Sequence, residues 1–359
     1  MKVVIAGGGT AGHVNPAIAL AEALEGADIS FVGTARGVEA EAVPRAGLPL
    51  ETIEVVGFDR ARPWSFPGVG WRAVRATRSA ATLLRSLKPD CVVGMGGYVS
   101  LPVGLAARRL RLPLVVHEQN IVLGLANKVL KRFARVVGVS FEETLAQVGP
   151  RGRYVGNPVG SALASCDWAV ARERGLETFG LDPSRRTLLV FGGSLGAKTI
   201  NDAARGLSSL WAGRSDRQVV HISGSRHEPV ATEAIGGLLW RSVGYVEGME
   251  EAYAVADLAL CRGGATTVAE IAVAALPAMI VPYPYHRDRQ QERHATVFAR
   301  EGAAVVLADR DTTAEEVARV ADDLLSDPVT LKAMGDSARS LARPSAAKDL
   351  ADLVRAAAA

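Results

Sequence analysis

The chain has 359 residues, of which 48% are hydrophobic and 22% are charged, and its formal net charge is +3 at pH 7. This length suits two domains rather than one core, and the composition is that of a globular protein. A net charge this small does not by itself support nucleic-acid binding, and we expect none. Cys91, Cys166 and Cys261 lack the spacing of a zinc site or a disulfide framework, so we interpret them as reduced thiols in a cytosolic protein.

We expect neither a signal peptide nor a membrane-spanning helix. Only four apolar residues follow Met1 and Lys2 before the first glycines, which is typical of a strand. The most apolar later stretch, residues 268–285, contains Glu270 and several prolines, so it cannot form a continuous spanning helix.

Short β-branched runs alternate with alanine- and leucine-rich helical stretches along the chain. The first series of predicted strands is Lys2–Ala6, Asp28–Val32, Cys91–Val93, Leu114–His117, Arg135–Val139 and Arg153–Val155. The second series is Thr187–Phe191, Gln218–Ser223, Ser242–Tyr245, Asp257–Cys261, Ala278–Val281 and Ala303–Leu307. This alternation predicts an α/β protein with two doubly wound parallel sheets built from right-handed βαβ units.

The two series are alike in plan, because each begins with a strand that runs into a glycine-rich turn, at residues 7–10 and 192–196. We predict two Rossmann-like domains, 1–160 and 161–335. A helical C-terminal segment over 336–359 follows, and its return to the first domain is left open. Ligands of such sheets bind beyond the carboxyl ends of the strands, so we expect the site in the cleft between the domains.

The first glycine turn, residues 7–10, is followed by Gly12 and His13 at the start of a predicted helix. Glycines let the backbone approach a ligand closely, and the N-terminus of a helix favours an anion. His13 adds a group able to transfer a proton near neutral pH. The turn matches G-x-G-x-x-G, but the second strand ends without the acidic residue that holds a nicotinamide ribose, which disfavours that cofactor.

Two further segments follow strands of the first series. Residues 94–98 (GMGGY) suit either a tight turn or a backbone cradle for a phosphate group, and both readings stay open. Residues 117–120 (HEQN) favour the binding of a polar substrate, because four polar side chains at the end of a strand are unusual for a plain turn.

In the second half, residues 261–270 (CRGGATTVAE) carry the most informative pattern. A strand ends, two glycines turn, and a helix begins near Ala265, so its N–H groups and two threonine hydroxyls would face an anion such as a diphosphate. Glu270 follows on this helix and can accept hydrogen bonds from two ribose hydroxyls. In the polar loop after the next strand, Gln290 and Gln291 can bind sugar hydroxyls through their amides.

The segment Arg60–Lys88 contains seven basic residues and no acidic one, with Trp64, Phe66 and Trp71 interleaved. We predict a helix over Val69–Lys88 that carries the arginines on one face. Basic residues with aromatics are typical of contact with an anionic membrane surface or with nucleic acid, and a solvated helix face is the open alternative.

Taken in order, these motifs resemble the MurG family of peptidoglycan glycosyltransferases. The resemblance is carried by GGGTAGH with Pro16, GMGGY, HEQN, GNP, GGSLGA, RGGATTVAE and DRQQ, and it extends from Lys2 to about Leu307. It implies a two-domain glycosyltransferase of the GT-B type at the cytoplasmic face of the cell membrane, bound peripherally through Arg60–Lys88. The implied reaction moves N-acetylglucosamine from UDP-N-acetylglucosamine, with inversion, to the 4-hydroxyl of N-acetylmuramyl-pentapeptide on undecaprenyl diphosphate.

The resemblance also implies site residues by position. It implies His13 as the base or a key polar group of the site. The implied contacts to the sugar nucleotide, with Gln291 added from the polar loop, are Thr10, Ala11, Gly12, Asn120, Ser194, Val246, Ala265, Thr266, Thr267, Val268, Ala269, Glu270, Gln290 and Gln291. We expect no metal ligands and no cofactor. Where the family has an arginine after GNPV, this chain has Gly160, and Arg262 is a candidate to replace that arginine.

Three other functions stay open on the sequence alone. A related transferase could act on another lipid or a secondary metabolite, since Gly160 departs from the family pattern. A non-catalytic nucleotide-sugar binding protein would keep the glycine turns without needing His13. An epimerase of UDP-N-acetylglucosamine would also use two domains. Formation of UDP, and its dependence on an acceptor, discriminates among these functions.

Overall fold

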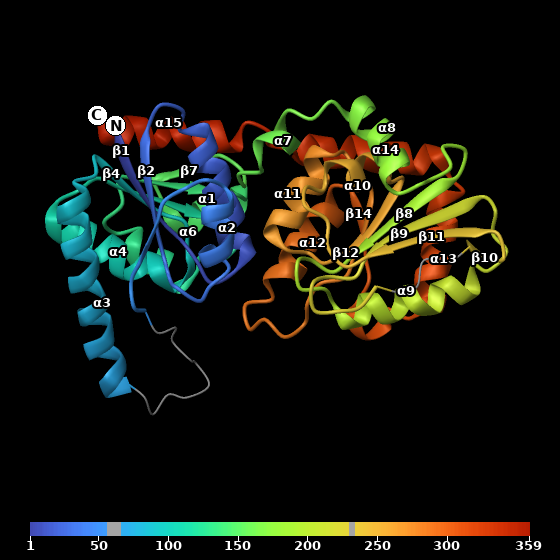
Figure 1. Cartoon of the computed structure of the whole chain (residues 1–359), viewed down its shortest axis with the longest axis horizontal. Coiled ribbons are helices and arrows are strands. Elements are labelled where there is room, and N and C mark those ends of the chain that lie inside the picture. The colour runs from blue at the N-terminus through green and yellow to red at the C-terminus, as the bar shows by residue number, and fades with distance from the viewer. Residues whose placement is uncertain (56–65, 230–233) are drawn as a thin grey trace. The chain divides into compact units, whose positions relative to one another are not determined.

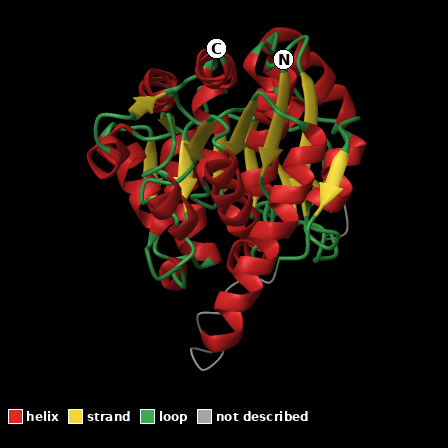
Figure 2. Cartoon of the chain, turned by 90° about the vertical axis from the view of Figure 1, so that its left-hand side faces the viewer, coloured by secondary structure: helices red, strands yellow, loops and turns green. Residues whose placement is uncertain are grey.

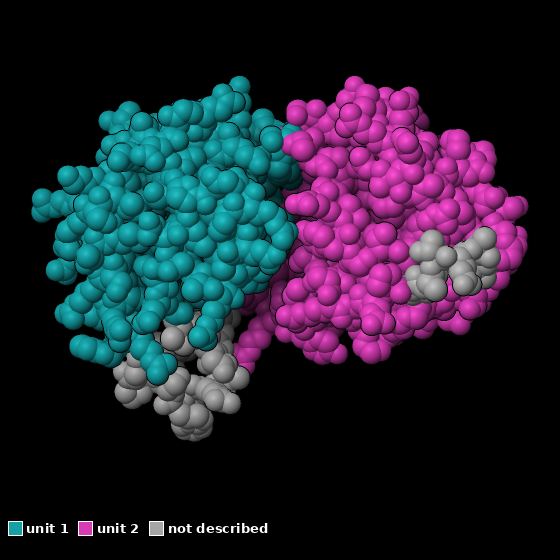
Figure 3. Space-filling model, viewed as in Figure 1, with its two compact units in different colours: residues 1–161, 344–359 teal, residues 162–343 magenta. Residues whose placement is uncertain are grey.

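The structure is a computed structural model of the chain, and it describes residues 1–55, 66–229 and 234–359 (Figure 1). The side chains of 66–70, 234 and 235 are outside that description. The chain forms two compact units (Figure 3). Unit 1 comprises Met1–Ser161 with Pro344–Ala359, and unit 2 comprises Ala162–Arg343.

Unit 1 contains a seven-stranded parallel sheet in the order β3-β2-β1-β4-β5-β6-β7. Its strands are β1 (Lys2–Ala6), β2 (Asp28–Gly33), β3 (Leu50–Thr52), β4 (Cys91–Gly94), β5 (Leu114–Glu118), β6 (Val136–Val139) and β7 (Gly152–Tyr154). Its helices are α1 (Ala11–Ala23), α2 (Glu39–Arg45), α3 (Phe66–Leu87), α4 (Gly97–Leu110), α5 (Leu125–Leu130), η2 (Glu142–Thr144), α6 (Leu145–Val148) and α15 (Ala346–Ala358).

Both faces of the unit 1 sheet are covered, because alternate residues of each strand enter different cores. Val3 and Ile5 of β1 pack with α1, α2 and α15 on one face. Val4 and Ala6 pack with α3, α4 and α5 on the other face. Figure 2 shows this arrangement as strands enclosed by helices. Strands buried on both faces are continuously apolar, which is why the short apolar runs of the sequence mark them.

Unit 2 contains a second seven-stranded sheet, in the order β10-β11-β9-β8-β12-β13-β14. Its strands are β8 (Arg186–Phe191), β9 (Arg217–Ile222), β10 (Ala234–Ile235), β11 (Leu238–Val243), β12 (Leu258–Cys261), β13 (Ala278–Ile280) and β14 (Ala304–Val306). Its helices are α8 (Trp168–Thr178), α9 (Lys198–Leu210), α10 (Glu250–Val255), α11 (Ala265–Val273), α12 (Gln290–Arg300), η3 (Asp309–Asp311), α13 (Ala314–Leu325) and α14 (Pro328–Leu341), with α7 (Ser161–Ala164) at the boundary.

The predicted α/β architecture of two parallel sheets is confirmed, and every predicted strand overlaps an observed one. The structure adds β3 and β10, which are too short to produce a recognisable apolar run. β10 pairs antiparallel with β11, and every other recorded strand pairing among the described residues is parallel.

The sheet of unit 2 buries one face against α9, α13 and α14, in a core that includes Trp211 and Trp240.

The C-terminal segment differs from the expected continuous helix. Residues 336–341 belong to α14 of unit 2, whereas α15 belongs to unit 1. Pro344 lies between the two helices, and proline cannot donate the backbone hydrogen bond that would continue α14. Leu350 and Val354 of α15 are fully buried in the same core as β1 and α1.

Helix α3 covers most of the predicted basic helix, whereas Trp64 and the rest of residues 60–65 lie outside the described part of the chain. In Figures 1 and 2 the N-terminal part of α3 extends away from the sheet of unit 1. Trp71 of this part is 66% exposed. Over the described residues, no helix combines the length and apolar character needed to cross a membrane.

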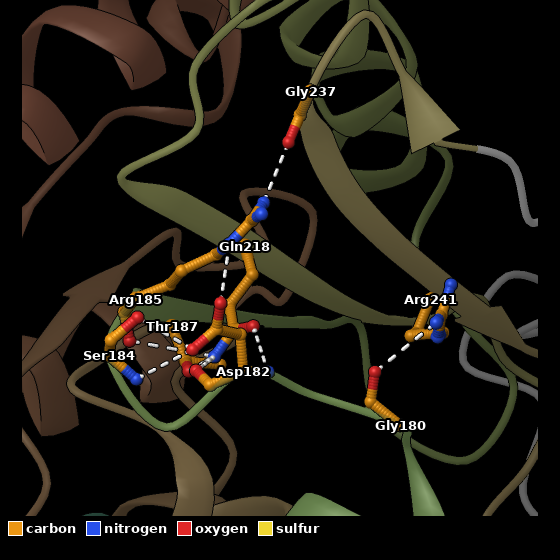
Figure 4. Close-up of polar contacts among 8 residues, drawn as sticks. All are labelled: Gly180, Asp182, Ser184, Arg185, Thr187, Gln218, Gly237 and Arg241. Atoms are coloured by element: carbon orange, nitrogen blue, oxygen red, sulfur yellow. Dashed lines mark hydrogen bonds and ion pairs between the residues drawn. The ribbon is translucent and has the colours of Figure 1, made fainter.

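A buried amide anchors the segment that enters the sheet of unit 2 (Figure 4). The side chain of Gln218, at the start of β9, donates to the carbonyl oxygen of Asp182 at 2.9 Å and to Thr187 Oγ1 at 2.8 Å. Its Oε1 accepts from the N–H of Asp182 at 2.9 Å. These contacts lie at the amino ends of β8 and β9, opposite the glycine turns, so we assign them to stability.

We therefore predict that Gln218→Leu destabilises unit 2 by about 2–4 kcal/mol, because it leaves the polar groups of Asp182 and Thr187 without partners. Urea unfolding followed by circular dichroism measures this change. Ser184→Ala is the control, since it removes only an exposed hydroxyl that donates to Asp182, and we expect a change within about 0.5 kcal/mol. Equal stability of Gln218→Leu and the parent protein would contradict the assignment.

Candidate functional site

In unit 1, the glycine turns that follow the neighbouring strands β1 and β4 pack backbone against backbone. A Cβ atom on Gly97 would lie 2.3 Å from the carbonyl oxygen of Gly8, and Gly97 has a φ of +73°. A Cβ on Gly96, whose φ is +93°, would lie 2.8 Å from His13 Nδ1. Both positions therefore require glycine for packing, which is a structural reason for the motif at 94–98.

The first glycine turn is braced by a buried carboxylate that belongs to none of the sequence motifs. Glu39, at the start of α2, is fully buried. Its carboxylate accepts from the N–H of Gly9 at 2.9 Å and from the hydroxyl of Thr34 at 2.7 Å. Because this carboxylate holds the Gly9 N–H, a phosphate group cannot use the same donor without displacing it. Thr10 at the N-cap of α1 is exposed, and Ala11 and Gly12 are partly exposed in its first turn.

A cavity of about 580 Å³ lies beside these turns, within unit 1. Its polar lining includes His13, Glu118, Asn120, Asn127 and Arg72. Its apolar lining is supplied chiefly by α3, α4 and α5, with one residue from the segment beyond β3, and comprises Val55, Ala73, Ala76, Leu101, Pro102, Leu105, Leu125 and Ala126. The size is that of a small-molecule site, and the lining is amphipathic.

The polar segment 117–120, which spans the end of β5, is largely buried, and Glu118 and Asn120 of this segment line the cavity. His117, Glu118 and Gln119 are each at most 1% exposed, and Asn120 is partly exposed. Glu118 accepts from the backbone and side-chain amides of Asn120 at 3.0 and 3.1 Å, and from Asn127 Nδ2 at 2.9 Å. Glu118 therefore orders the loop that presents Asn120 to the cavity.

Unit 2 repeats the packing of glycine turns, here after the neighbouring strands β8 and β9. A Cβ atom on Gly224 would lie 2.1 Å from the backbone nitrogen of Gly196, and both residues have positive φ. This contact holds the turn that contains Ser194, whose carbonyl oxygen accepts from the N–H of Ser225 at 3.0 Å. The Ser194 residue itself is exposed, and Val246 is partly exposed in the loop after β11.

The turn after β12 leads into α11, which begins at Ala265 as predicted. Thr267 and Ala269 are partly exposed, whereas Ala265 and Val268 are buried. Thr266 Oγ1 is enclosed and has no hydrogen-bond partner among the described residues. The turn is held from α12, because His294 Nδ1 donates to the carbonyl oxygen of Gly263 at 2.9 Å.

Glu270 interacts with a tyrosine that the sequence analysis did not identify. The hydroxyl of Tyr253, on α10, donates to Glu270 Oε2 at 2.7 Å, and Tyr253 is 2% exposed. The pKa of Glu270 is raised to about 7, chiefly because the carboxyl is buried; the hydrogen bond from Tyr253 opposes this rise, and the negative charge of Glu250 adds to it. A carboxyl group that titrates near neutral pH is unusual, and such groups gather at functional sites.

The predicted glutamine pair has two different environments. Gln291 Oε1 accepts from the backbone N–H of Tyr283 at 2.9 Å, so this side chain fixes the loop after β13. Gln290, at the first position of α12, is partly exposed. The loop that precedes α12 is exposed from Tyr283 to Arg289, which leaves it accessible to a ligand.

Arg262, the candidate to replace the arginine missing at Gly160, is held by partners within unit 2. Its guanidinium donates to Asp309 Oδ1 at 2.6 Å and to the carbonyl oxygen of Val281 at 3.1 Å, and the side chain is 10% exposed. Asp311, two residues further on, pairs instead with Arg310. Gly160 is exposed, and a Cβ atom there would meet open space.

The two buried cysteines have a structural role. Burial raises the pKa of the Cys91 and Cys261 thiols to about 12 in each case, so they are protonated at neutral pH and do not act as nucleophiles.

The carboxyl ends of each sheet therefore gather most of the predicted site residues. Unit 1 places His13 and Asn120 in one cavity lining. In unit 2, Ser194 and the residues of α11 follow the adjacent strands β8 and β12, and Gln290 follows the next strand, β13. Glycine turns, an amphipathic cavity and a partly buried acid on a helix are the features of a sugar-nucleotide enzyme.

Comparison with known proteins agrees with this arrangement. Residues 3–139 match the glycosyltransferase family 28 N-terminal domain, and residues 187–353 match the glycosyltransferase family 28 C-terminal domain. A solved structure of MurG from Acinetobacter baumannii superposes with a TM-score of 0.77 at 30% identity, covering 99% of each chain. The class of protein is thus a glycosyltransferase of the GT-B type.

Curated relatives give the narrower assignment. The proteins from Desulfitobacterium hafniense and Cutibacterium acnes are 39% and 41% identical to this chain. The first alignment covers 96% of each chain, and the second covers 98% of this chain and 96% of the relative. Both relatives are named UDP-N-acetylglucosamine–N-acetylmuramyl-(pentapeptide) pyrophosphoryl-undecaprenol N-acetylglucosamine transferase. The chain belongs to the MurG family.

Removing the Tyr253 hydroxyl should raise the pKa of Glu270 above its value of about 7. The folded pKa already exceeds the ordinary 4.5. The contribution of Glu270 to stability is therefore fully present below pH 4.5 and is lost as pH rises through about 7, at roughly 1.4 kcal/mol for each pKa unit. Carboxyl carbon NMR titration of Tyr253→Phe measures the shift, with Glu270→Gln used to assign the signal. A midpoint at or below that of the parent protein would contradict the hydrogen bond.

Proposed function

We propose that this protein transfers N-acetylglucosamine from UDP-N-acetylglucosamine to N-acetylmuramyl-pentapeptide carried on undecaprenyl diphosphate, a step of peptidoglycan synthesis. The single observation that carries the proposal is the near-full-length match to relatives with this named activity, at up to 41% identity. The two other classes left open by the sequence, a non-catalytic binder and an epimerase, have no such support.

The chemistry of unit 2 favours the sugar nucleotide. The N-terminus of α11 offers backbone N–H groups to a diphosphate, with Thr266 and Thr267 in its first turn. Glu270, one turn further on, is partly exposed and can accept two hydrogen bonds from the ribose hydroxyls. The remaining proposed contacts to the sugar nucleotide come from Ser194, Gln290 and the backbone at Val246. Gln291 fixes the loop after β13 through its hydrogen bond to the N–H of Tyr283.

The cavity of unit 1 favours the lipid-linked acceptor. An acceptor of this kind joins a sugar and a diphosphate to an isoprenoid chain, so it needs a lining that is polar in part and apolar in part. His13, Asn120 and Arg72 supply hydrogen bonds and positive charge, while Leu101 and Leu105 of α4 supply apolar contact.

The proposed reaction is a single displacement with inversion. The acceptor 4-hydroxyl attacks the anomeric carbon, and its proton passes to His13 as the new carbon–oxygen bond forms. The bond to the diphosphate breaks at the same time, and its electron pair leaves on UDP. The N-terminus of α11 would stabilise the negative charge that develops on the leaving group. General-base assistance of this kind contributes about 10²–10⁴-fold.

We further propose that α3 contacts the membrane surface that holds the acceptor. Trp71 is 66% exposed and Val74 is 46% exposed, and Arg72, Arg75 and Arg78 are exposed on the same helix. An exposed aromatic flanked by basic residues is suited to an anionic bilayer, where each basic residue adds about 1 kcal/mol of attraction. This would place the protein peripherally at the cytoplasmic face.

Release of UDP from UDP-N-acetylglucosamine tests the proposed function directly. We expect release only when the lipid-linked muramyl-pentapeptide is present, with the disaccharide lipid as the product. Release without any acceptor would indicate a hydrolase or an epimerase that hydrolyses its substrate, and no release would indicate a binding protein or an epimerase that retains the nucleotide on its product.

We expect His13→Ala to lower kcat by about 10²–10⁴-fold, because it removes the proposed base. Donor affinity and the unfolding midpoint should be close to those of the parent protein. Steady-state kinetics with both substrates measures the effect, and a near-normal kcat would remove His13 from the mechanism.

Glu270→Ala should raise the KM for the donor, since two hydrogen bonds from the ribose to a charged group are lost, each contributing about 1.5–3 kcal/mol. The KM for the acceptor should change little. Donor KM is measured at saturating acceptor, and an unchanged value would refute the ribose contact.

Charge reversal on α3 should weaken vesicle binding. We expect Arg75→Glu with Arg78→Glu to reduce sedimentation with phosphatidylglycerol-containing vesicles by at least about tenfold. Arg310→Glu, an exposed arginine of unit 2, is the matched control and should bind as the parent protein does. Equal binding to neutral phosphatidylcholine vesicles would count against a membrane role for α3.

A further inference from the structure

We infer that Gln119 is a positioning residue that selects the tautomer of His13 with its proton on Nδ1, leaving Nε2 as the free base. The assignment of the tautomer stands on the geometry of unit 1, and only its catalytic consequence rests on the proposed function. The contacts that carry it join His13 on α1, Gln119 after β5 and His117 within β5.

The orientation of the Gln119 amide is set by a backbone carbonyl. Gln119 Nε2 lies 2.9 Å from the carbonyl oxygen of Met95, a group that can only accept a hydrogen bond. The amide nitrogen must therefore face Met95, because the opposite orientation would bring two acceptor oxygens together. Gln119 Oε1 then faces His13 Nδ1 at 2.9 Å. Since this oxygen can only accept, His13 Nδ1 must carry the proton.

His117 closes the network from the other side with the same result. Its Nε2 lies 3.0 Å from the carbonyl oxygen of Gly156, so Nε2 must donate. Its Nδ1 lies 3.1 Å from Gln119 Nε2 and accepts the second amide hydrogen. His117 is fully buried, and burial lowers its pKa to about 4, so the ring is neutral and can play both roles. The carbonyl groups of Met95 and Gly156 can only accept hydrogen bonds. Each of them therefore independently requires the same orientation of the Gln119 amide, with Nε2 as the donor and Oε1 facing His13.

The packing of Gly96 holds the His13 ring against Gln119. A Cβ atom at Gly96 would lie 2.8 Å from His13 Nδ1, 2.9 Å from His13 Cε1 and 3.3 Å from Gln119 Oε1. The absence of a side chain at this one position lets the two groups meet. His13 also lines the 580 Å³ cavity, the place where a bound hydroxyl would meet its ring.

The arrangement differs from a histidine oriented by a carboxylate. A neutral amide fixes which nitrogen is free without adding negative charge beside the ring. The base is thereby positioned by hydrogen bonds that exist before substrate binds, and the correct tautomer does not have to be selected during the reaction.

Nitrogen NMR of the protein labelled at its histidine rings tests the inference. The parent protein should show His13, assigned by loss of its signals in His13→Gln, with a protonated Nδ1 and an unprotonated Nε2 in its neutral form. In Gln119→Leu the two tautomers should both be populated. We expect kcat of this variant to fall by about tenfold, with the donor KM within twofold. An Nε2-protonated ring in the parent protein, or an unchanged ring in Gln119→Leu, would overturn the inference.

Gln147→Leu is the matched control. Gln147 is a partly buried glutamine of unit 1 whose Nε2 donates to the carbonyl oxygen of Ile121 and whose Oε1 accepts from the N–H of Leu123. Its loss should leave the His13 tautomer unchanged. The tautomer of the parent protein can be read without any substrate, so a failure of the proposed transferase activity and a failure of this inference give separate results.

Discussion

The close approach of backbone at paired glycine turns is the constraint on which the rest of the structure depends. In unit 1 the turns after β1 and β4 meet at Gly8 and Gly97, and in unit 2 the turns after β8 and β9 meet at Gly196 and Gly224. In each pair the strands are neighbours in a parallel sheet, so their carboxyl ends emerge side by side. A side chain at Gly97, Gly196 or Gly224 would separate the turns and with them the groups that they carry.

This constraint links the fold to the site chemistry. Because no Cβ atom intervenes at Gly96, the ring of His13 can lie against Gln119. Because the first turn is braced by the buried Glu39, the start of α1 has a defined position. Buried polar side chains such as Glu39 and Gln119 therefore hold the turns and His13 in position. The more exposed residues beside them are the ones that can contact substrates.

The sequence predicted the strands well, because strands buried on both faces are short uninterrupted apolar runs. It did not predict Tyr253 beside Glu270, since no spacing relates a residue of α10 to one of α11. The role of Glu39 was missed for the same reason, because its partners lie in two different turns. The sequence shows that residues 117–120 are polar. It does not show that most of these side chains are buried, because their burial depends on β6 and on residues near 156. The sequence analysis predicted one helix over 336–359 because the segment is rich in alanine. It overlooked Pro344, where the chain passes from α14 to α15.

The path of the C-terminal helix has a consequence for how the protein is made. The core of unit 1 includes Leu350 and Val354 of α15, which leave the ribosome after all of unit 2 has been synthesised. Unit 2 is continuous in sequence and can complete its core first, whereas the N-terminal unit must wait for the last residues of the chain. The core of unit 1 is therefore completed only after unit 2 has been synthesised, although most of unit 1 is synthesised first.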